Sequence, residues 1–374
     1  MSEDIKKGLM GVTVDETAIS KVMPEINSLT YRGYAAQDLC ANCKFEEVAY
    51  LILNGELPNK KQLKDFERQE SKERKISKNL VNAIKNIPRN AHPMDVARTA
   101  VSIMGLEDKD TRNNSPKANI RKVMRIFAKM PVALAAFYRT RKGKKIIPPK
   151  KKLSFSENFF HMCFGKVPNK DIVKAFDVSL ILYAEHSFNV STFTARTITS
   201  SLSDIHGAIT GAIASLKGPL HGGANEEVMH MMNKIKKPEN ALNWINKALK
   251  NKDVVMGFGH RVYKSGDSRV PTMRKYFGKV AKIKKDKKFE KIYDIVEKVM
   301  IEKKNIHPNV DYPTGPTYHL MGFDTDFFTP IFVISRITGW SAHIFEQHAA
   351  NKLIRPLASY NGNKYRKVVN LNKR

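Results

Sequence analysis

Two histidines and one aspartate, each in a turn rich in glycine or proline, are the residues best suited to acid–base chemistry. His221 lies in Gly-Pro-Leu-His-Gly-Gly-Ala-Asn-Glu, directly before an amphipathic segment that predicts a helix. The glycines allow close approach of a ligand, and a helix N-terminus favours a neutral imidazole that donates a hydrogen bond. His260 lies in Gly-Phe-Gly-His-Arg-Val-Tyr-Lys, and Asp311 in His-Pro-Asn-Val-Asp-Tyr-Pro-Thr-Gly. This set predicts acid–base chemistry on an anionic substrate that contains a carbonyl group.

Three arginines are candidates for binding that anion. Arg336 interrupts the apolar stretch Phe-Val-Ile-Ser-Arg-Ile-Thr-Gly-Trp, and Arg355 lies in Leu-Ile-Arg-Pro. An arginine in an apolar environment is costly unless it is paired or faces a ligand. A structural ion pair explains each one alone equally well. Together with Arg269 they predict guanidinium forks for the carboxylates of a substrate.

Composition favours a globular protein of the cytoplasm. The 374 residues are enough for roughly two domains of ~150 residues, and 42% of them are apolar. No apolar run approaches the ~18 residues of a membrane span, and the first residues lack the apolar stretch of a secretory signal. The three cysteines, two of them in Cys-Ala-Asn-Cys, have no zinc-site partners at suitable spacing. They predict buried thiols in a reducing compartment and no metal site. Together with the absence of a long apolar run, the composition also predicts no membrane association.

Positive charge is the outlier of the composition. The chain has 65 basic and 36 acidic residues, a net charge of +29. Such a charge attracts polyanions, so a nucleic-acid-binding protein is one alternative. The basic runs lack interleaved aromatics and zinc-finger spacing, which makes this alternative the less favoured one. A lysine-rich solvated surface, with a cleft for an anionic substrate, is the preferred interpretation.

Helix signals dominate along the chain, so the predicted fold class is all-α with at most a small N-terminal β hairpin near residues 11–33. We expect a kink or break at Pro131, a helix cap at Asp171, and an N-cap at Thr329. Helices are predicted at residues 45–53, 92–104, 119–138, 171–185, from 191, 206–217, 226–235 and 331–347.

At these motifs the sequence resembles the citrate synthase family, including its 2-methylcitrate synthase branch. The resemblance runs from Tyr-Arg-Gly-Tyr at residue 31 to the Arg-Pro at residue 355, with the motifs in the family's order. It implies a homodimer of two-domain, almost all-α subunits with the active site in the cleft between the domains. The implied large domain comprises residues 1–218 and 323–374, and the small domain residues 219–322.

The resemblance also implies the role of each site residue. Asp311 would remove a proton from an acyl-CoA, with His221 and His260 polarising the thioester and the ketone of oxaloacetate. The expected oxaloacetate ligands are His186, His260, Arg269, Arg336 and, from the partner subunit, Arg355. The expected CoA-binding residues are Val254, Val255, Met256, Gly257, Phe258, Lys264, Lys304 and Asn309.

The resemblance implies no resident cofactor, because the CoA thioester is a substrate. The residues in the matching motifs favour a 2-methylcitrate synthase with citrate synthase activity over a dedicated citrate synthase that uses acetyl-CoA only. Two departures from the family's pattern affect this expectation. Ser268 replaces a proline before Arg269, and Pro313 follows soon after Asp311. Pro313 restricts the backbone beside the expected base, which leaves the preferred acyl chain open.

Overall fold

A computed structural model describes residues 5–260, 262–263 and 266–374. Most of this part of the chain is helical, which confirms the predicted fold class. The α-helices are α1 (Ala36–Asn42), α2 (Phe45–Asn54), α3 (Lys60–Glu73), α4 (Lys78–Asn86), α5 (Pro93–Glu107), α6 (Pro116–Thr140), α7 (Phe155–Phe164), α8 (Lys170–Tyr183), α9 (Val190–Ser200), α10 (Ile205–Leu216), α11 (Ala224–Ile235), α12 (Pro238–Asn251), α13 (Val270–Lys284), α14 (Lys288–Lys304), α15 (Asp311–Met321) and α16 (Phe328–Ala349). Short 3-10 helices are η1 (Lys7–Leu9), η2 (Pro24–Ile26), η3 (Thr325–Phe327) and η4 (Leu371–Lys373).

Three short strands near the N-terminus form an antiparallel sheet in the order β1 (Ser20–Met23), β2 (Ser28–Tyr31) and β3 (Tyr34–Ala35). Ser20 pairs with Tyr31 across β1 and β2. These two strands confirm the predicted hairpin, whereas β3 was not expected because two residues are too few to show alternation. The Tyr31 hydroxyl donates to the carbonyl of Ile181 at 3.0 Å, which ties the sheet to the end of α8.

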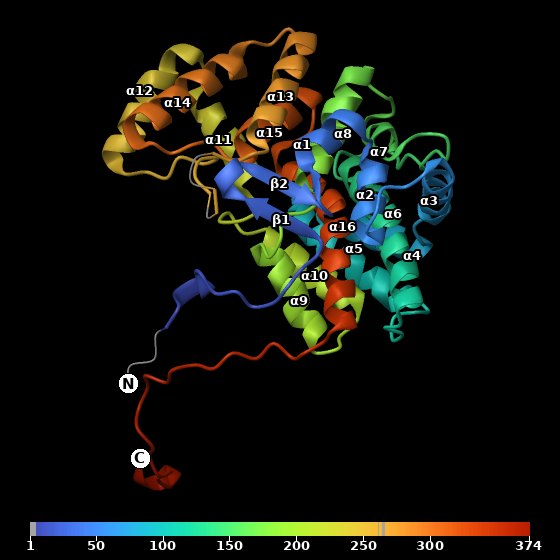
Figure 1. Ribbon diagram of the computed structural model, residues 1–374, viewed down its shortest axis with the longest axis vertical. Helices are drawn as coiled ribbons and strands as arrows, with labels where there is room; N and C mark the ends of the chain where they lie inside the picture. Colours follow the sequence, from blue (N-terminus) through green and yellow to red (C-terminus); the bar gives the residue numbers. More distant parts are fainter. Residues whose placement is uncertain (1–4, 261, 264–265) are drawn as a thin grey trace.

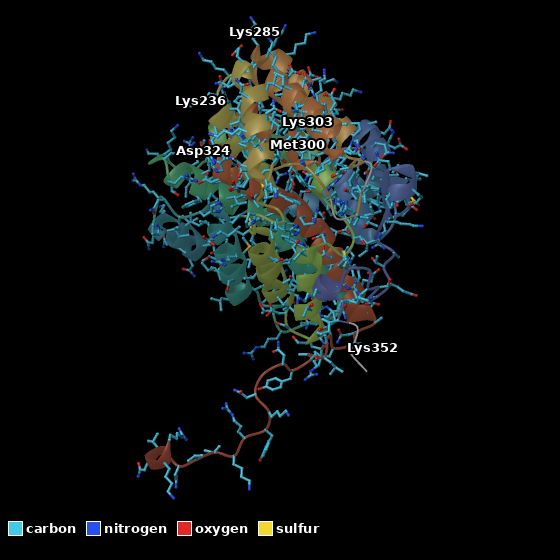
Figure 2. The ribbon with its side chains drawn as sticks, turned by 90° about the vertical axis from the view of Figure 1, so that its left-hand side faces the viewer. Lys236, Lys285, Met300, Lys303, Asp324 and Lys352 are labelled. Carbon is cyan, nitrogen blue, oxygen red and sulfur yellow. The ribbon has the colours of Figure 1, made fainter. Side chains whose placement is uncertain are left out.

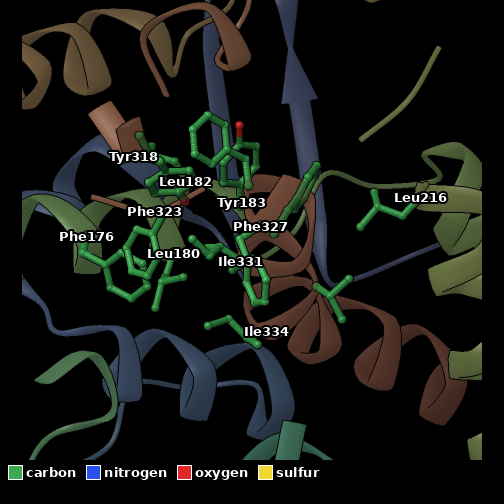
Figure 3. Packing of buried hydrophobic residues seen from close by; sticks show 14 of the residues in the cluster. Phe176, Leu180, Leu182, Tyr183, Leu216, Tyr318, Phe323, Phe327, Ile331 and Ile334 are labelled. Atoms are coloured by element: carbon green, nitrogen blue, oxygen red, sulfur yellow. The ribbon is translucent and has the colours of Figure 1, made fainter. Parts of the chain in front are cut away.

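Helix α16 runs through the centre of the molecule (Figure 1) and packs against α2, α5, α6, α8, α9 and α10. Every residue of α16 from Phe328 to Ile344 is buried, which is typical of a helix surrounded by protein. Figure 3 shows Ile331 and Ile334 of α16 in one apolar core with Leu180 and Leu182 of α8. Arg336 and Trp340 are therefore held deep inside the protein, with at most 1% of either residue exposed.

Of the expected kink or break at Pro131, the break does not occur, because α6 continues through this residue from Pro116 to Thr140. A proline inside a helix costs about 3 kcal/mol through a lost hydrogen bond and a steric clash. Residues 126–138 are buried almost without interruption, and Pro131 is among them. Packing on all sides offsets the local cost, so the helix stays intact.

Two predicted helix caps are wrong. The cap of α8 is Asn169, whose side chain accepts a hydrogen bond from the backbone N–H of Asp171 at 2.7 Å. Helix α16 begins at Phe328 instead of being capped by Thr329. The Thr329 hydroxyl instead donates to Glu226, a residue far away in the sequence. A tertiary partner thus replaces the local capping bond.

Helices α11 to α15 lie together on one side of the molecule, at the upper left of Figure 1. Within this group α13 and α11 pack on α15, and α12 packs on α14. The group falls inside the predicted small domain, residues 219–322, and α13 also contacts α8 outside it. The domain limits themselves remain a prediction.

The lysine side chains lie mainly on the outside. Lys236, Lys285 and Lys303 are exposed, and Figure 2 shows Lys285 at the top end of the molecule. This agrees with the interpretation of a solvated basic surface. After α16 the chain is extended and exposed, and it leads away from the body toward the C-terminus (Figure 1).

The cysteines are in the positions that the composition predicts. Cys40, Cys43 and Cys163 are buried and form no disulfide. Within the described ranges, no helix is long and apolar enough to cross a lipid bilayer.

Candidate active site

A tight turn between α10 and α11 presents His221. After α10 ends at Leu216, the N–H of Gly222 donates to the carbonyl of Leu216 at 3.0 Å. A Cβ atom at Gly222 would lie 2.6 Å from the Leu216 side chain, so only glycine fits. The turn places His221 just before the first residue of α11, as the sequence pattern predicts.

Hydrogen bonds to Ser191 fix the tautomer of the His221 imidazole. Its Nε2 accepts from the backbone N–H of Ser191 at 3.2 Å and lies 2.8 Å from Ser191 Oγ. Trp340 Nε1 donates to the same Oγ at 3.0 Å, which holds Ser191 in place. The proton of the neutral ring therefore lies on Nδ1, ready to donate. Burial first, and the positive charge of Arg336 second, lower the pKa of His221 to about 3.

The first residue of α15 is Asp311, and its carboxylate lies against α8. Its Oδ1 accepts a hydrogen bond from the Tyr183 hydroxyl at 2.5 Å. Burial raises the pKa of Asp311 to about 6, although the Tyr183 hydrogen bond and the charge of Arg269 act in the opposite direction. A carboxylate with this pKa is ionised at neutral pH and is a stronger base than an exposed aspartate.

His260 follows two glycines with left-handed backbone angles, Gly257 (φ 84°) and Gly259 (φ 80°). Its Nδ1 accepts from the backbone N–H groups of Val262 at 3.0 Å and Tyr263 at 3.2 Å. The proton of a neutral His260 is therefore on Nε2. The ring can then donate a hydrogen bond through Nε2.

Asn309 links the turns that carry His260 and Asp311. Its side-chain amide donates to the carbonyl of Gly259 at 3.0 Å, and its Oδ1 accepts from the N–H of Asp311 at 3.1 Å. Its own N–H donates to the carbonyl of Gly257 at 2.9 Å. Asn309 thus makes three hydrogen bonds within the protein, and the CoA contact that the resemblance implies stays a prediction.

His186 and Arg336 bring two unpartnered nitrogens into the same buried region. His186 Nε2 and Arg336 Nη1 are buried and have no hydrogen-bond partner within the described part of the protein. The imidazole of His186 lies 5.1 Å from that of His260, measured between ring centroids. Burial, followed by the charges of Arg269, His260 and Arg336, lowers the pKa of His186 well below its ordinary value. A buried guanidinium nitrogen without a partner, such as Arg336 Nη1, favours an anionic ligand.

Arg269 is held by an acidic neighbour on one side of its guanidinium. Its Nε and Nη2 donate to the two carboxylate oxygens of Asp267 at 2.9 and 2.7 Å. Asp267 Oδ2 also accepts from the N–H of Val310 at 3.1 Å, next to Asp311. The fork predicted for a substrate carboxylate is therefore engaged by Asp267 along one edge, which leaves Nη1 for a ligand.

The two departures from the family's pattern are accommodated without disturbing the site. Ser268 Oγ lies 2.8 Å from the Tyr263 hydroxyl, and Asp267 still accepts the N–H of Arg269 at 3.0 Å. Pro313 lies in the first turn of α15, where a missing N–H interrupts no helical hydrogen bond.

Arg355 does not join the other site residues of its own chain. It lies in the exposed segment that follows α16. The preceding N–H, that of Ile354, donates to Ser200 Oγ at the end of α9 at 3.0 Å. This position is compatible with a role in another subunit, and that role remains a prediction.

The residues predicted to bind CoA are spread over several environments. Val254 is 81% exposed, Val255 is buried, and the Phe258 ring packs on Tyr312 with centroids 4.5 Å apart. Met256, which lies between Val255 and Phe258 in the sequence, is half-buried. Lys304 is exposed at the end of α14. Lys264 lies outside the described residues.

A pocket of about 260 Å³ adjoins the predicted CoA segment. Its lining comes from the His260 loop and from the segment before α15: Gly259, His260, Tyr263, Gly266, Asp267, Asn305, Ile306, His307 and Pro308. Of the predicted site residues, only His260 lines it. His307 and Pro308 belong to the motif that contains Asp311, whereas Asn305 and Ile306 precede it and carry no charge pattern that would mark them.

Several contacts that organise the site were also not predicted. Tyr183 contacts Asp311 although the apolar spacing of α8 indicates only a core residue. Ser191, itself held by Trp340, fixes His221. Asp267 fixes Arg269. The available signal was proximity in sequence, since Tyr183 and Ser191 flank His186 in one motif and Asp267 precedes Arg269 by two residues.

Comparisons with known proteins agree with this geometry. A family model described as citrate synthase, C-terminal domain, matches residues 8–357. The chain is 54% identical over 377 residues to a 2-methylcitrate synthase of Corynebacterium glutamicum, with 99% of this chain and 98% of the relative covered. It is 52% identical over 365 residues to a citrate synthase of Mycolicibacterium smegmatis, with 98% and 97% covered.

A solved structure has the same fold over its full length. It is the ternary complex of carboxymethyl coenzyme A and oxaloacetate with citrate synthase from Thermoplasma acidophilum. The TM-score is 0.94 at 32% sequence identity, and 100% of both chains is covered. The chain described here belongs to the citrate synthase family.

Proposed function

We propose that this enzyme condenses an acyl-CoA with oxaloacetate and hydrolyses the adduct to citrate or 2-methylcitrate and free CoA. The observation that carries the proposal is that Tyr183 joins the buried carboxylate of Asp311 to Arg336. The Tyr183 hydroxyl donates to Asp311 Oδ1 at 2.5 Å, and the Tyr183 carbonyl accepts from Arg336 Nε at 2.6 Å. Arg336 Nη1 is buried and has no partner in the described part of the protein. The names of the relatives, 2-methylcitrate synthase and citrate synthase, support the same reaction.

In the first step Asp311 takes a proton from the carbon beside the thioester carbonyl. The electron pair moves onto the thioester oxygen, which would carry negative charge. The Nδ1–H of His221 donates a hydrogen bond to that oxygen and stabilises the enol or enolate. The low pKa of His221 supports this role, because a neutral ring keeps Nδ1–H as a donor without giving up a full proton.

In the second step the enol carbon attacks the ketone carbon of oxaloacetate. His260 donates its Nε2–H to the ketone oxygen and protonates the alkoxide that forms. Water then cleaves the thioester and releases CoA, which makes the overall reaction irreversible in practice. Because the chain's own donors activate both carbonyl groups, the proposal includes no metal and no resident cofactor.

The two carboxylates of oxaloacetate would be held by His186, Arg336 and the remaining Nη1 edge of Arg269. We further propose a homodimer in which Arg355 of each chain enters the site of the other. The exposed position of Arg355, outside the site of its own chain, supports this arrangement. The active site would then lie in a cleft between the predicted large and small domains. We expect this cleft to close when the substrate binds.

The CoA thioester would lie along residues 254–258, near Lys264 and Lys304, with its chain entering beside His260. The pocket of about 260 Å³ behind His260 supports an approach from this side. Asn309 would act mainly by joining the two catalytic turns. The free, buried cysteines support a cytoplasmic location for the enzyme.

For the acyl group we favour propionyl-CoA together with acetyl-CoA. The two differ by one methylene, which an apolar pocket distinguishes by only ~1–3 kcal/mol. Kinetics with both acyl-CoAs under the same conditions test this preference. A strong preference in kcat/KM for acetyl-CoA would make the enzyme a dedicated citrate synthase.

The test of the mechanism is Asp311→Asn. We expect loss of thiol release from acyl-CoA and oxaloacetate, while calorimetry shows oxaloacetate binding close to that of the wild type. Wild-type turnover in the variant would exclude Asp311 as the base. A nucleic-acid-binding protein would instead show tight, salt-dependent binding to DNA or RNA and no thiol release.

A further inference from the structure

The turn between α8 and α9, residues 184–189, carries His186 on the side of the candidate active site. Ser187, the next residue, has a left-handed backbone (φ 51°), which is unfavourable for a residue with a side chain. A turn of this kind persists only where its surroundings fix it. The contacts that fix it therefore control where the His186 imidazole lies.

Two hydrogen bonds from Ser20 hold this turn to the N-terminal sheet. Ser20 Oγ accepts the N–H of Ser187 at 2.9 Å and donates its own proton to Glu185 Oε1 at 2.9 Å. Ser20 is buried, and Glu185 is completely buried. The Ser20 hydroxyl thus makes hydrogen bonds with Glu185 and Ser187, the residues on both sides of His186.

Helix α16 holds the same turn from the opposite side. His343 Nε2 lies 2.9 Å from Glu185 Oε1, and its Nδ1 lies 3.4 Å from Arg196 Nη1. Since the arginine can only donate to Nδ1, the neutral ring donates through Nε2 to Glu185. The His343 ring also packs edge-on against Phe188, with centroids 5.5 Å apart.

Close packing leaves Glu185 little room to move. A Cβ atom at Gly339 would lie 2.2 Å from Glu185 Oε2 and 2.5 Å from the carbonyl of Ala184. The glycine lets α16 approach the turn directly. The Glu185 carboxylate is therefore held between α16 and β1.

The N-terminal segment is attached at further points on the same side. Asp15 Oδ2 accepts from Arg196 Nη2 at 2.5 Å, and the N–H of Ala18 donates to Glu346 Oε1 at 2.9 Å. Arg196 also donates to Glu346 at 2.9 Å. These contacts anchor the segment that leads into Ser20.

We propose that Glu185 is a positioning residue and that Ser20 and His343 hold it so that His186 presents Nε2 to oxaloacetate. The N-terminal strand β1 is then part of the substrate site, although it touches no reacting atom. This inference rests on the proposed function, because it takes oxaloacetate as the ligand of His186. It concerns affinity for the keto acid and leaves the acyl-CoA side of the site unchanged.

The test compares Ser20→Ala with Ser28→Ala as its matched control. Ser28 is a buried serine of the adjacent strand, and its hydroxyl has no hydrogen bond within the described ranges. Calorimetry gives the Kd of oxaloacetate, and thiol release gives kcat and both KM values. For Ser20→Ala we expect the Kd and KM of oxaloacetate to rise about tenfold, with kcat and the KM of acyl-CoA within about twofold. Ser28→Ala should match the wild type.

Glu185→Asp provides a second measurement. It keeps the negative charge near Arg336 but withdraws the carboxylate by one methylene from Ser20 and His343. We expect the same selective loss of oxaloacetate affinity as in Ser20→Ala. Wild-type oxaloacetate affinity in Ser20→Ala, with or without a lower Tm, would overturn the inference. If the wild-type enzyme itself neither binds oxaloacetate nor releases thiol, the proposed function fails instead.

Discussion

The hydroxyl of Tyr183 donates a 2.5 Å hydrogen bond to Asp311 Oδ1 and so joins the end of α8 to the first turn of α15. Tyr183 is fully buried, and burial first among several causes raises its pKa well above the ordinary value. The tyrosine therefore stays protonated and donates its hydroxyl proton to Asp311. It stabilises the ionised form of Asp311 against the cost of burial.

Removal of this donor should shift the pH dependence of the reaction. The pKa of Asp311 is raised to about 6, and only the carboxylate can accept a proton, so kcat/KM for acyl-CoA should fall as pH drops below about 6. In Tyr183→Phe the pKa should rise further, moving this acidic limb upward by about one pH unit. A pH–rate profile measures the shift. Tyr318→Phe is the control, because the Tyr318 hydroxyl bonds to Ser179 instead. Coincident profiles for wild type and Tyr183→Phe would contradict the prediction.

Asp311→Asn should stabilise the protein at neutral pH. The folded-state pKa of Asp311 is raised from 3.8 to about 6, so the folded state binds a proton more tightly than the unfolded state. Stability from this group is present below pH 4 and is lost as pH rises through about 6. At pH 8 the amide should therefore raise the free energy of unfolding by up to about 3 kcal/mol. Thermal unfolding at pH 8 and pH 4 checks this, with a gain in Tm expected only at pH 8.

Arg336→Met should remove most of the affinity for oxaloacetate. The Arg336 guanidinium keeps its orientation through a 2.6 Å bond from Nε to the carbonyl of Tyr183, which leaves Nη1 for the substrate. Loss of a buried, charge-assisted contact costs about 2–4 kcal/mol, so the Kd should rise at least about thirtyfold. Calorimetry with oxaloacetate measures it. Arg274→Met is a suitable control, because Arg274 pairs with Glu290 and Asp294 on the surface of α13 and α14. Equal affinities in the two variants would argue against a substrate role for Arg336.

The proposed exchange of Arg355 can be tested by mixing two inactive variants. Asp311→Asn lacks the base, and Arg355→Ala lacks the arginine given to the partner. If the subunits exchange, each mixed dimer has one site with both residues, and about a quarter of all sites should recover. Thiol release before and after refolding the mixture measures this. Activity that stays at the level of the separate variants would place Arg355 outside the partner's site.

Much of the fold could be predicted from periodicity, whereas details set by distant partners could not. The apolar spacing that predicts α5, α9, α10 and α16 reflects burial along one face, which any window of sequence contains. The cap at Thr329 failed because Glu226 accepts its hydroxyl, and the break at Pro131 failed because neighbouring helices enclose α6. No local pattern contains either partner.

The same limit applies to the candidate site. His221, His260 and Asp311 are recognisable because titratable side chains in glycine- or proline-rich turns are unusual. Tyr183 follows the spacing of an ordinary core residue, and only the packing of α8 on α15 reveals its contact with Asp311. The pairing of Arg269 with Asp267 likewise depends on side-chain geometry, which sequence order alone does not give.

Helix α16 is the last helix before the extended tail, yet it supplies Arg336 and His343 to a region that begins with Ser20. During synthesis on a ribosome, more than three hundred further residues must emerge after Ser20 before strand β1 can contact the region that α16 completes. Contacts of such long separation slow folding and are made late. A nascent or truncated chain that lacks this helix has neither Arg336 nor His343, so we expect catalytic competence to appear only when translation is nearly finished.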